Sequence, residues 1–302
     1  MQKNKTLLTI SRQKELFLMI IPVMAYVILF CYVPLWGWTM AFQNYKPGAK
    51  QQRWVGFDQF KFLFQEERFL RVLRNTVAMS AINLVLSFVF AIFFALMVNE
   101  IKQKFFKRAV QTISYLPHFL SWVIACSMIA DFLSSGGTLN TILLNLGLIK
   151  QPIILLAEAD KFWWVAGWSS VWKSMGWNSI IYLAAITSID PELYESAGLD
   201  GAGRLARMWH ITLPSIKSTI LVLLIMNIGW ILNAGYELQY ILGNMLNWNM
   251  AETIDVYVIR YGIALGNYSL GTAMGMFKTV VSVILIAAAN QLSKRFAQES
   301  LV

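Results

Sequence analysis

The sequence is poor in charge. Asp, Glu, Lys and Arg make up 14% of the 302 residues, whereas a soluble domain has roughly 25%. Hydrophobic residues make up 57%. This composition excludes an ordinary water-soluble globular domain and predicts an integral membrane protein with most of its mass in the bilayer. The twelve Trp and eleven Tyr residues suit the aromatic belts found at membrane interfaces.

Cysteine and histidine are scarce, with two of each. Cys31 and Cys126 both lie in apolar runs, so we expect no disulfide. The two histidines are far apart in the sequence and make no ligand spacing with the cysteines, so the sequence predicts no metal site. It also offers no convincing pair of a nucleophile and a base, and we expect no catalytic residue in this chain.

A nucleotide-binding motif is absent as well. No segment matches the G-x-x-x-x-G-K-[ST] phosphate loop. The run Gly201-Ala202-Gly203-Arg204 cannot act as one, because it lacks the Lys-Ser/Thr pair and a preceding strand. We therefore expect a chain that does not hydrolyse ATP and carries no cofactor of its own.

Long apolar runs are what the chain has in abundance. A spanning helix needs about 20 mostly apolar residues. Six segments meet this requirement, at about 16–41, 73–98, 112–133, 162–189, 216–242 and 269–289. The sequence thus predicts one all-α, multi-pass membrane domain over residues 1–302, with six transmembrane helices.

Lys and Arg are unevenly distributed between the loops. With the N-terminus inside, most of them fall in the cytoplasmic segments 1–15, 99–111, 190–215 and 290–302. The outside loops after the third and fifth spans hold only Lys150, Lys161 and Arg260, although the loop after the first span is basic. We predict that both termini are cytoplasmic. Charges that flank the spans explain most of the net +9, so no nucleic-acid partner is expected.

The segment between the fourth and fifth spans is polar and contains glycines. Asp190-Pro191 is a helix-start signal, with Asp as the N-cap and Pro at the first helical position. Three glycines then allow a sharp turn before a second short helix over Arg204–His210. The pattern predicts a helix–turn–helix on the membrane face, with small residues that let another protein approach.

Residues of this segment resemble a known motif. The "EAA" loop of ABC importer permeases is matched by Glu195, Ala197, Gly201, Ile211, Leu213 and Pro214. Ser196 replaces the central Ala, and Asp200-Gly201-Ala202 extend the match. The similarity continues at Leu116-Pro117-His118-Phe119, Trp168, Gly176-Trp177, Ile189-Asp190-Pro191 and Gly266–Gly271. The chain resembles the carbohydrate-uptake permeases, closest to the LplB-type polysaccharide permeases, with the maltose permeases as more distant relatives.

The resemblance implies the type I ABC importer permease fold and a set of partners. In this family the loop at 190–214 is a coupling helix seated in a cytoplasmic ATPase, which binds the ATP and Mg. The residues implied at that contact are Glu195, Ser196, Ala197, Asp200, Gly201 and Ala202. The implied partners are a second homologous permease, two such ATPases, an extracellular solute-binding protein and an oligosaccharide, at the bacterial inner (cytoplasmic) membrane.

Polar residues inside spans are functional candidates. The fifth span offers Asn227, Trp230, Asn233 and Glu237, at steps that place them on one helical face, with Tyr236 beside them. Aromatic and amide side chains suit a sugar, so we predict that these residues line the substrate path. The alternative is helix packing, because Asn between spans often donates to a neighbouring helix.

Lys173 and Lys278 lie near the middle of the fourth and sixth spans. An unpaired ammonium there costs about 2.5–3.5 kcal/mol, so each should face a partner or a wet cavity. Glu237 is one candidate partner and a carboxylate on an acidic sugar is another; we favour the structural pair. Because of these lysines, an importer of the same fold for an acidic or phosphorylated solute remains an alternative function. A second alternative, an ion-coupled secondary transporter, would not account for the connector at 190–214.

Overall fold

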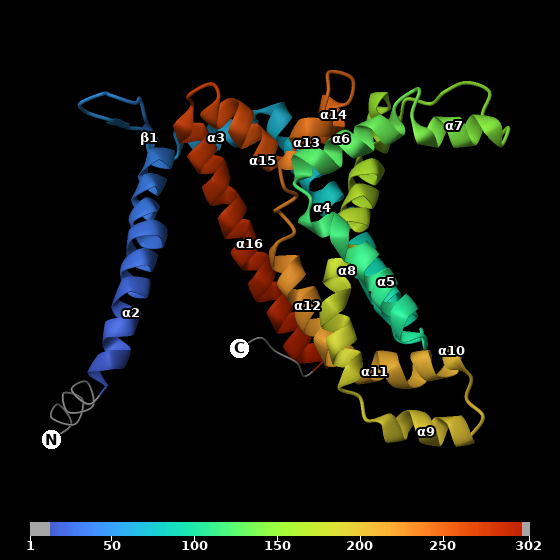
Figure 1. Ribbon diagram of the computed structural model, residues 1–302. Helices are drawn as coiled ribbons and strands as arrows, with labels where there is room; N and C mark the ends of the chain where they lie inside the picture. Colours follow the sequence, from blue (N-terminus) through green and yellow to red (C-terminus); the bar gives the residue numbers. More distant parts are fainter. Residues whose placement is uncertain (1–12, 298–302) are drawn as a thin grey trace, which may run out of the picture.

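The protein is almost entirely helical (Figure 1). The computed structural model describes residues 13–297. Its longest helices are α4 (Glu67–Asn99), α8 (Phe162–Thr187) and α16 (Tyr268–Ala297). Helix α2 (Lys14–Val27) continues as a π-helical turn (Ile28–Tyr32) and then as a 3-10 segment (Val33–Phe42). Four helical stretches of the described residues are long and apolar enough to cross a membrane, or five if one bent pair counts as a span.

Two sets of shorter elements lie at opposite ends of the long helices (Figure 1). The hairpin end, uppermost in the figure, holds β1 (Gln43–Asn44), β2 (Arg53–Trp54), α3 (Asp58–Gln65), α7 (Thr138–Asn145), 3-10 turns at Leu155–Ala157 and Ala159–Lys161, α13 (Glu237–Leu242), α14 (Trp248–Ala251) and α15 (Ile254–Tyr257), which continues as π-helix over Val258–Ile263. The connector end holds α9 (Pro191–Leu199), α10 (Arg204–Arg207) and α11 (Leu213–Ser215), with a π-helical turn at Met208–Thr212 between the last two.

Close packing of α4 against α8 forms the centre of the molecule. Helix α5 (Lys104–Tyr115) packs against both of them, whereas α6 (Trp122–Leu133) packs mainly against α13 and α7. Gly176 of α8 lies so close to Ser114 that an added Cβ would overlap the Ser114 carbonyl group. Small residues at helix crossings allow such close approach in membranes. Buried apolar clusters fill the space at both ends of this pair.

The hairpin end is held together around Glu252. This carboxylate is only 2% exposed and accepts hydrogen bonds from Arg68 Nε and Nη2, at 2.9 and 3.0 Å. Asn75 donates to the Glu252 carbonyl oxygen at 3.1 Å, and the Tyr257 hydroxyl donates to Glu66 at 2.7 Å. Because Arg68 and Glu252 are far apart in the sequence, this two-bond ion pair ties the start of α4 to the segment that precedes α15.

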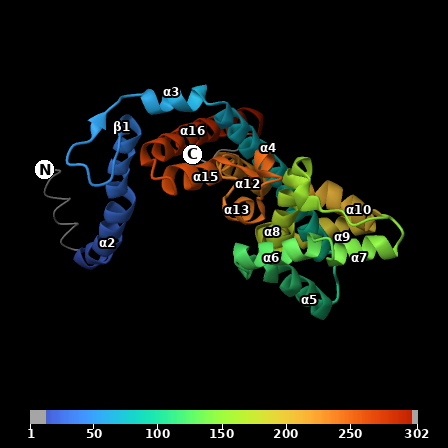
Figure 2. The same cartoon turned by 90° about the horizontal axis from the view of Figure 1, so that it is seen from above.

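Helix α2 stands apart from the rest of the molecule. Both views show it separated from α4, α8 and α12 (Figures 1 and 2). None of the most apolar window of Lys14–Phe42 is buried within the chain, and its 3-10 portion packs against α16. The uncovered part must face lipid or another subunit, because its apolar side chains are not covered by its own chain.

The fifth predicted segment, 216–242, is not one continuous helix. Helix α12 (Lys217–Gly229) ends before Trp230, and residues 230–236 form turns and an extended link to α13. Gly229 packs against the side chain of Ile286 in α16, and Gly235 adopts a left-handed φ of 78°. The expectation that Asn227, Trp230, Asn233 and Glu237 share a helical face is therefore wrong, since the helix ends within that set.

The third predicted segment, 112–133, is also interrupted. It starts inside α5, passes through a 3-10 turn at Leu116–Phe119 that contains Pro117, and enters α6 after the N-cap Ser121. Proline favours the start of a helical turn and cannot donate its backbone nitrogen. By contrast, α4, α8 and α16 cover the predicted ranges 73–98, 162–189 and 269–289, except that α8 ends at Thr187.

Candidate functional site

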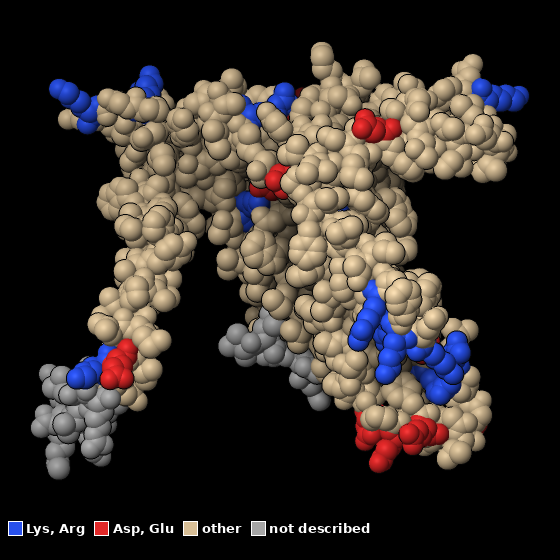
Figure 3. All heavy atoms as spheres, in the orientation of Figure 1, with Lys and Arg blue, Asp and Glu red and all other residues tan. Residues whose placement is uncertain are grey.

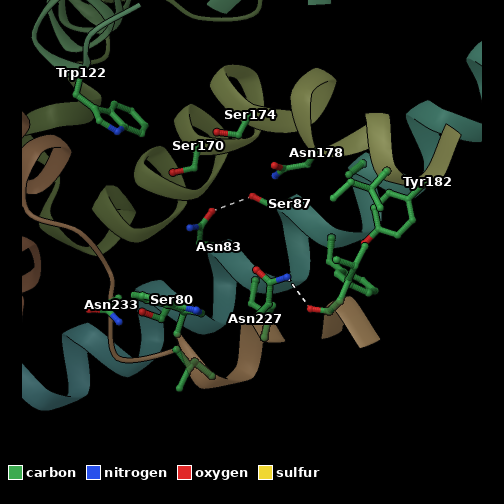
Figure 4. A pocket seen from close by; sticks show the side chains of 17 residues that line it. Ser80, Asn83, Ser87, Trp122, Ser170, Ser174, Asn178, Tyr182, Asn227 and Asn233 are labelled. Atoms are coloured by element: carbon green, nitrogen blue, oxygen red, sulfur yellow. Dashed lines mark hydrogen bonds between the residues drawn. The ribbon is translucent and has the colours of Figure 1, made fainter. Parts of the chain in front are cut away.

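A polar cavity lies between α4 and α8, beside α12 (Figure 4). Its volume is about 320 Å³. Its polar and aromatic lining residues are Ser80, Asn83, Ser87, Phe88, Trp122, Ser170, Ser174, Asn178, Tyr182, Asn227, Trp230 and Asn233. No charged residue is among those that line it. The arrangement offers neutral hydrogen-bonding groups and aromatic faces, which suit a ligand rich in hydroxyl groups.

Helical spacing brings the polar groups of this cavity together. Ser80, Asn83 and Ser87 follow one another at steps of three and four in α4, so they share one face of that helix. The series Ser170, Ser174 and Asn178 does the same in α8, and Figure 4 shows the two series facing each other.

Part of the hydrogen-bonding capacity in this cavity is already used. Ser87 donates to Asn83 at 2.9 Å, and Asn227 donates to the Leu223 carbonyl at 2.7 Å. Ser80 Oγ is buried and has no partner among the described residues. A buried hydroxyl in this state commonly meets water or a ligand.

A second cavity, of about 520 Å³, lies between α12, α15 and α16. Trp230 and Asn233 line this cavity as well as the first, so the link after α12 separates the two. The second cavity differs in carrying an ion pair, in which Lys278 of α16 contacts Asp255 of α15 at 2.5 Å.

The structure brings some of the predicted path residues together and leaves others outside. Asn227, Trp230 and Asn233 line the first cavity, and Lys278 lines the second. Tyr236 and Glu237 are exposed but line neither.

The two span lysines have other partners than the one expected. Glu237 is not the partner of either, because Lys278 pairs with Asp255 and Lys173 donates to backbone carbonyls. Lys173 is 6% exposed and lines neither cavity. Its ammonium donates to the carbonyls of Pro117 and His118, at 3.4 and 2.8 Å, and lies 5.2 Å from the Trp122 ring centroid.

Sequence reasoning missed the serine and asparagine series of α4 and α8, and it missed Asp255. The series carried a usable signal, because polar residues recur every three or four positions within otherwise apolar runs. Asp255 carried none, since it lies outside the predicted spans and approaches Lys278 only through the packing of α15 on α16.

The connector forms two antiparallel arms joined by a tight turn. Asp190 caps α9 as predicted, accepting from the Glu192 backbone at 3.0 Å. The turn is a Schellman motif, in which Gly201 has φ 79°, the Ala202 amide donates to the Ala197 carbonyl at 2.9 Å, and Gly201 donates to Gly198 at 3.2 Å. This motif requires a left-handed residue, which explains a glycine at this position.

The second arm of the connector is longer than predicted. It runs from Arg204 to Ser215, includes Pro214, and is bent by 62° from α12. The hydroxyls of Tyr194 and Thr212 lie 2.9 Å apart and join the two arms.

The predicted contact residues gather at the tip of the connector. Glu195, Ser196, Asp200 and Gly201 are exposed, and Ala197 and Ala202 are partly buried. Leu199, which the sequence reasoning did not single out, is 91% exposed at the end of α9. Acidic side chains lie on α9, with basic side chains between them and the long helices (Figure 3). The tip is thus an acidic projection with an uncovered leucine.

Two proteins of one bacterium are similar to this chain over nearly its whole length. It is 44% identical to Protein LplB of Bacillus subtilis (strain 168), over 97% of this chain and 92% of the relative. It is also 44% identical to the polygalacturonan/rhamnogalacturonan transport system permease protein YteP of the same organism, over 99% of this chain and 94% of the relative.

A solved bacterial ABC transporter involved in the import of the acidic polysaccharide alginate contains a similar chain. The TM-score is 0.89 and the identity 39%, covering 97% of this chain and 99% of the other. A second structure, of a bacterial alginate ABC transporter in complex with an alginate pentasaccharide-bound periplasmic protein, matches at TM-score 0.89 and 38% identity, over 97% and 98% of the two chains.

These likenesses confirm the resemblance seen in the sequence and extend over nearly the whole chain. The apolar helices and the bacterial relatives make this an integral protein of a bacterial membrane with the fold of an ABC importer permease. The model of the family described as "Binding-protein-dependent transport system inner membrane component" matches residues 87–298, and the chain belongs to that family.

Proposed function

We propose that this chain is the transmembrane permease subunit of an ATP-driven ABC importer for oligosaccharides or polysaccharide-derived sugars. The observation that carries the proposal is the likeness over nearly the full chain to a permease of a polygalacturonan/rhamnogalacturonan transport system and to a chain of an alginate importer. The polar cavity supports it, because hydroxyl, amide and indole groups without charge suit a sugar ring.

The proposal includes six spans with both termini in the cytoplasm. The third span comprises α6 and the end of α5, and the fifth comprises α12 with the link to α13. Broken helices are tolerated at membrane depth where they line a cavity, and the link at 230–236 adjoins two. This arrangement places the connector end in the cytoplasm.

The proposed assembly pairs this chain with a second, homologous permease. The apolar surface of α2 is not covered by its own chain and is therefore available to such a neighbour. Two cytoplasmic ATPases supply the ATP hydrolysis, since this sequence has no phosphate loop. A solute-binding protein outside the membrane delivers the saccharide, in keeping with the description of the family.

The tip of the connector is the proposed contact with one ATPase. Glu195, Asp200 and Gly201 project there, and the hydrogen-bonded turn makes the tip rigid. A rigid lever can carry the closure of the ATPases into the spans and so alternate access from one side of the membrane to the other.

Reconstitution tests the proposed function. The chain, its second permease and the ATPase are expected to co-purify, and proteoliposomes that contain them should import labelled oligosaccharides only with ATP and the binding protein. Import that follows an ion gradient without the ATPase would instead support a secondary transporter, and co-purification without saccharide import would point to another solute.

Labelling tests the proposed topology. In a variant with Cys31 replaced by serine, a cysteine at Arg204 should react with membrane-impermeant maleimide only from the cytoplasm, and one at Met245 only from outside. Both positions are exposed, Met245 by 94%, whereas Cys126 is buried and should stay unreactive. The reverse pattern would show that the basic loop after the first span, not the other loops, decides the orientation.

A further inference from the structure

One ion pair provides all the charge on the wall of the second cavity. Lys278 and Asp255 are 15% and 24% exposed, and no other charged residue is among those that line this cavity. The remaining wall is formed by apolar, hydroxyl, amide and indole groups. A solute in this cavity would therefore meet one ammonium group and one carboxylate.

Lys278 lies in a stretch of the chain where charged residues are rare and usually functional. Lys278 belongs to the part of α16 that is apolar enough to cross a membrane, Tyr268–Gln291. Ionisable residues in such stretches pair with one another or line pathways for ions and substrates. Both descriptions hold here, because the pair borders a cavity.

Comparison with Glu252 distinguishes this pair from a purely structural one. Glu252 is 2% exposed and uses both oxygens for Arg68. Asp255 and Lys278 share a single hydrogen bond within the described part of the chain and remain partly open to the cavity. Gly275, one turn before Lys278, has open space where a Cβ would lie. Gly275 also lines the cavity and leaves space there.

The ammonium of Lys278 has the capacity to bind a second carboxylate. It carries three N–H donors, and the bond to Asp255 uses one. A carboxylate that enters the cavity is repelled by Asp255 unless it shares or takes over the ammonium. The Lys278 ammonium is therefore an anion-binding group occupied by the Asp255 carboxylate, which an incoming carboxylate can displace.

The neighbouring groups match the rest of a sugar acid. Trp230 is 67% exposed and, with Asn233, lines both this cavity and the polar one. A ring resting on the Trp230 indole would have the serine and asparagine groups on one side and Lys278 on the other. A uronate residue carries both hydroxyl groups and one carboxylate, so it fits the two cavities together.

We propose that Lys278 binds the carboxylate of a uronate-containing oligosaccharide, and that Asp255 holds the ammonium while no cargo is present. The inference rests on the proposed function, because it names the chemistry of the cargo. Asp255 keeps the binding reversible, since a site that passes its solute onward must bind it weakly enough to release it. A neutral sugar gains nothing from Lys278, so the exchange selects for acidic cargo.

Binding to the assembled transporter in nanodiscs tests the proposal. The solute-binding protein is left out, so that its own selectivity does not enter. The probes are labelled trisaccharides of mannuronate, guluronate and galacturonate, each compared with its carboxyl-reduced, neutral counterpart. Wild type should bind at least one uronate more tightly than its neutral counterpart.

The variants assign that preference to the pair. Lys278→Met should weaken uronate binding about tenfold, as expected for the loss of a hydrogen bond to a charged group, and leave neutral binding within about twofold. Lys278→Arg should keep the preference. Asp255→Asn should tighten uronate binding, because it removes the competing carboxylate. Lys161→Met, in an exposed pair outside this cavity, is the matched control and should change neither.

A double variant keeps the test decisive if a single change disturbs folding. Lys278→Met with Asp255→Asn leaves no uncompensated charge, so it should assemble normally, bind neutral trisaccharides like wild type and lose the uronate preference. A double variant that retains the preference, or a wild type that binds both kinds equally, would overturn the proposal and leave the sugar importer standing. A transporter that binds and imports no saccharide would overturn the proposed function itself.

Discussion

Gly201→Asp is expected to reduce uptake at least tenfold (roughly the cost of losing a central contact in an interface), while the protein still inserts and assembles. An added Cβ at Gly201 meets no atom of residues 13–297 within 4 Å, its chain neighbours aside. The new side chain would therefore project into the space of the proposed ATPase contact. Uptake into proteoliposomes and the amount of ATPase that co-purifies measure the effect.

Two further variants separate docking from backbone strain. Gly203 lies in the same turn, also in open space, but has an ordinary φ of −70°. Gly203→Asp adds the same side chain without left-handed strain and should retain far more uptake. Gly201→Asn should fail like Gly201→Asp, because Asn tolerates the left-handed region and still adds bulk. Normal uptake and ATPase binding in Gly201→Asp would remove the docking assignment.

Trp230→Ala is expected to weaken saccharide uptake by about tenfold or more, in the range found when a central aromatic contact is removed. The indole is 67% exposed and borders both cavities, so its loss removes the apolar surface on which a ring could rest. Stimulation of the ATPase by the binding protein should be largely kept, because the connector is untouched. Uptake kinetics and ATPase rates of the same preparation separate the two.

Trp164→Ala supplies the control for size and residue type. Trp164 is 53% exposed on α8 and lines neither the polar cavity nor the one with the ion pair. Its replacement should leave uptake close to wild type. Unchanged uptake in Trp230→Ala would show that Trp230 does not line the substrate path. A structure of the assembly in which Trp230 and Asn233 face lipid would show the same for both residues. Neither result would affect the assignment of the chain as an importer subunit.

Local signals predicted the connector well. The cap at Asp190 and the left-handed glycine at 201 depend on hydrogen bonds between residues close in the sequence, so a short stretch specifies them. The same signals gave too short a second arm. The predicted helix over Arg204–His210 in fact continues to Ser215 through a π-helical turn at Met208–Thr212.

The lysines show where local reasoning fails. Both were correctly expected to find a partner, because an unpaired ammonium within a span is costly. Neither partner was identified. Lys173 donates to carbonyls 55 and 56 positions away, and Lys278 pairs with a residue 23 positions away. Such contacts depend on how helices pack, and the residues themselves give no spacing that reveals it.

The sequence by itself determined that this is a helical membrane protein, because the free energy of transfer into a bilayer depends on composition and run length. It also determined the connector and, through the matching residues, the family. Only the tertiary structure decided where the fifth segment breaks, that α4 and α8 face each other with their polar series, and that Asp255 meets Lys278. These features arise between segments distant in the chain, where packing and not local preference sets which groups meet.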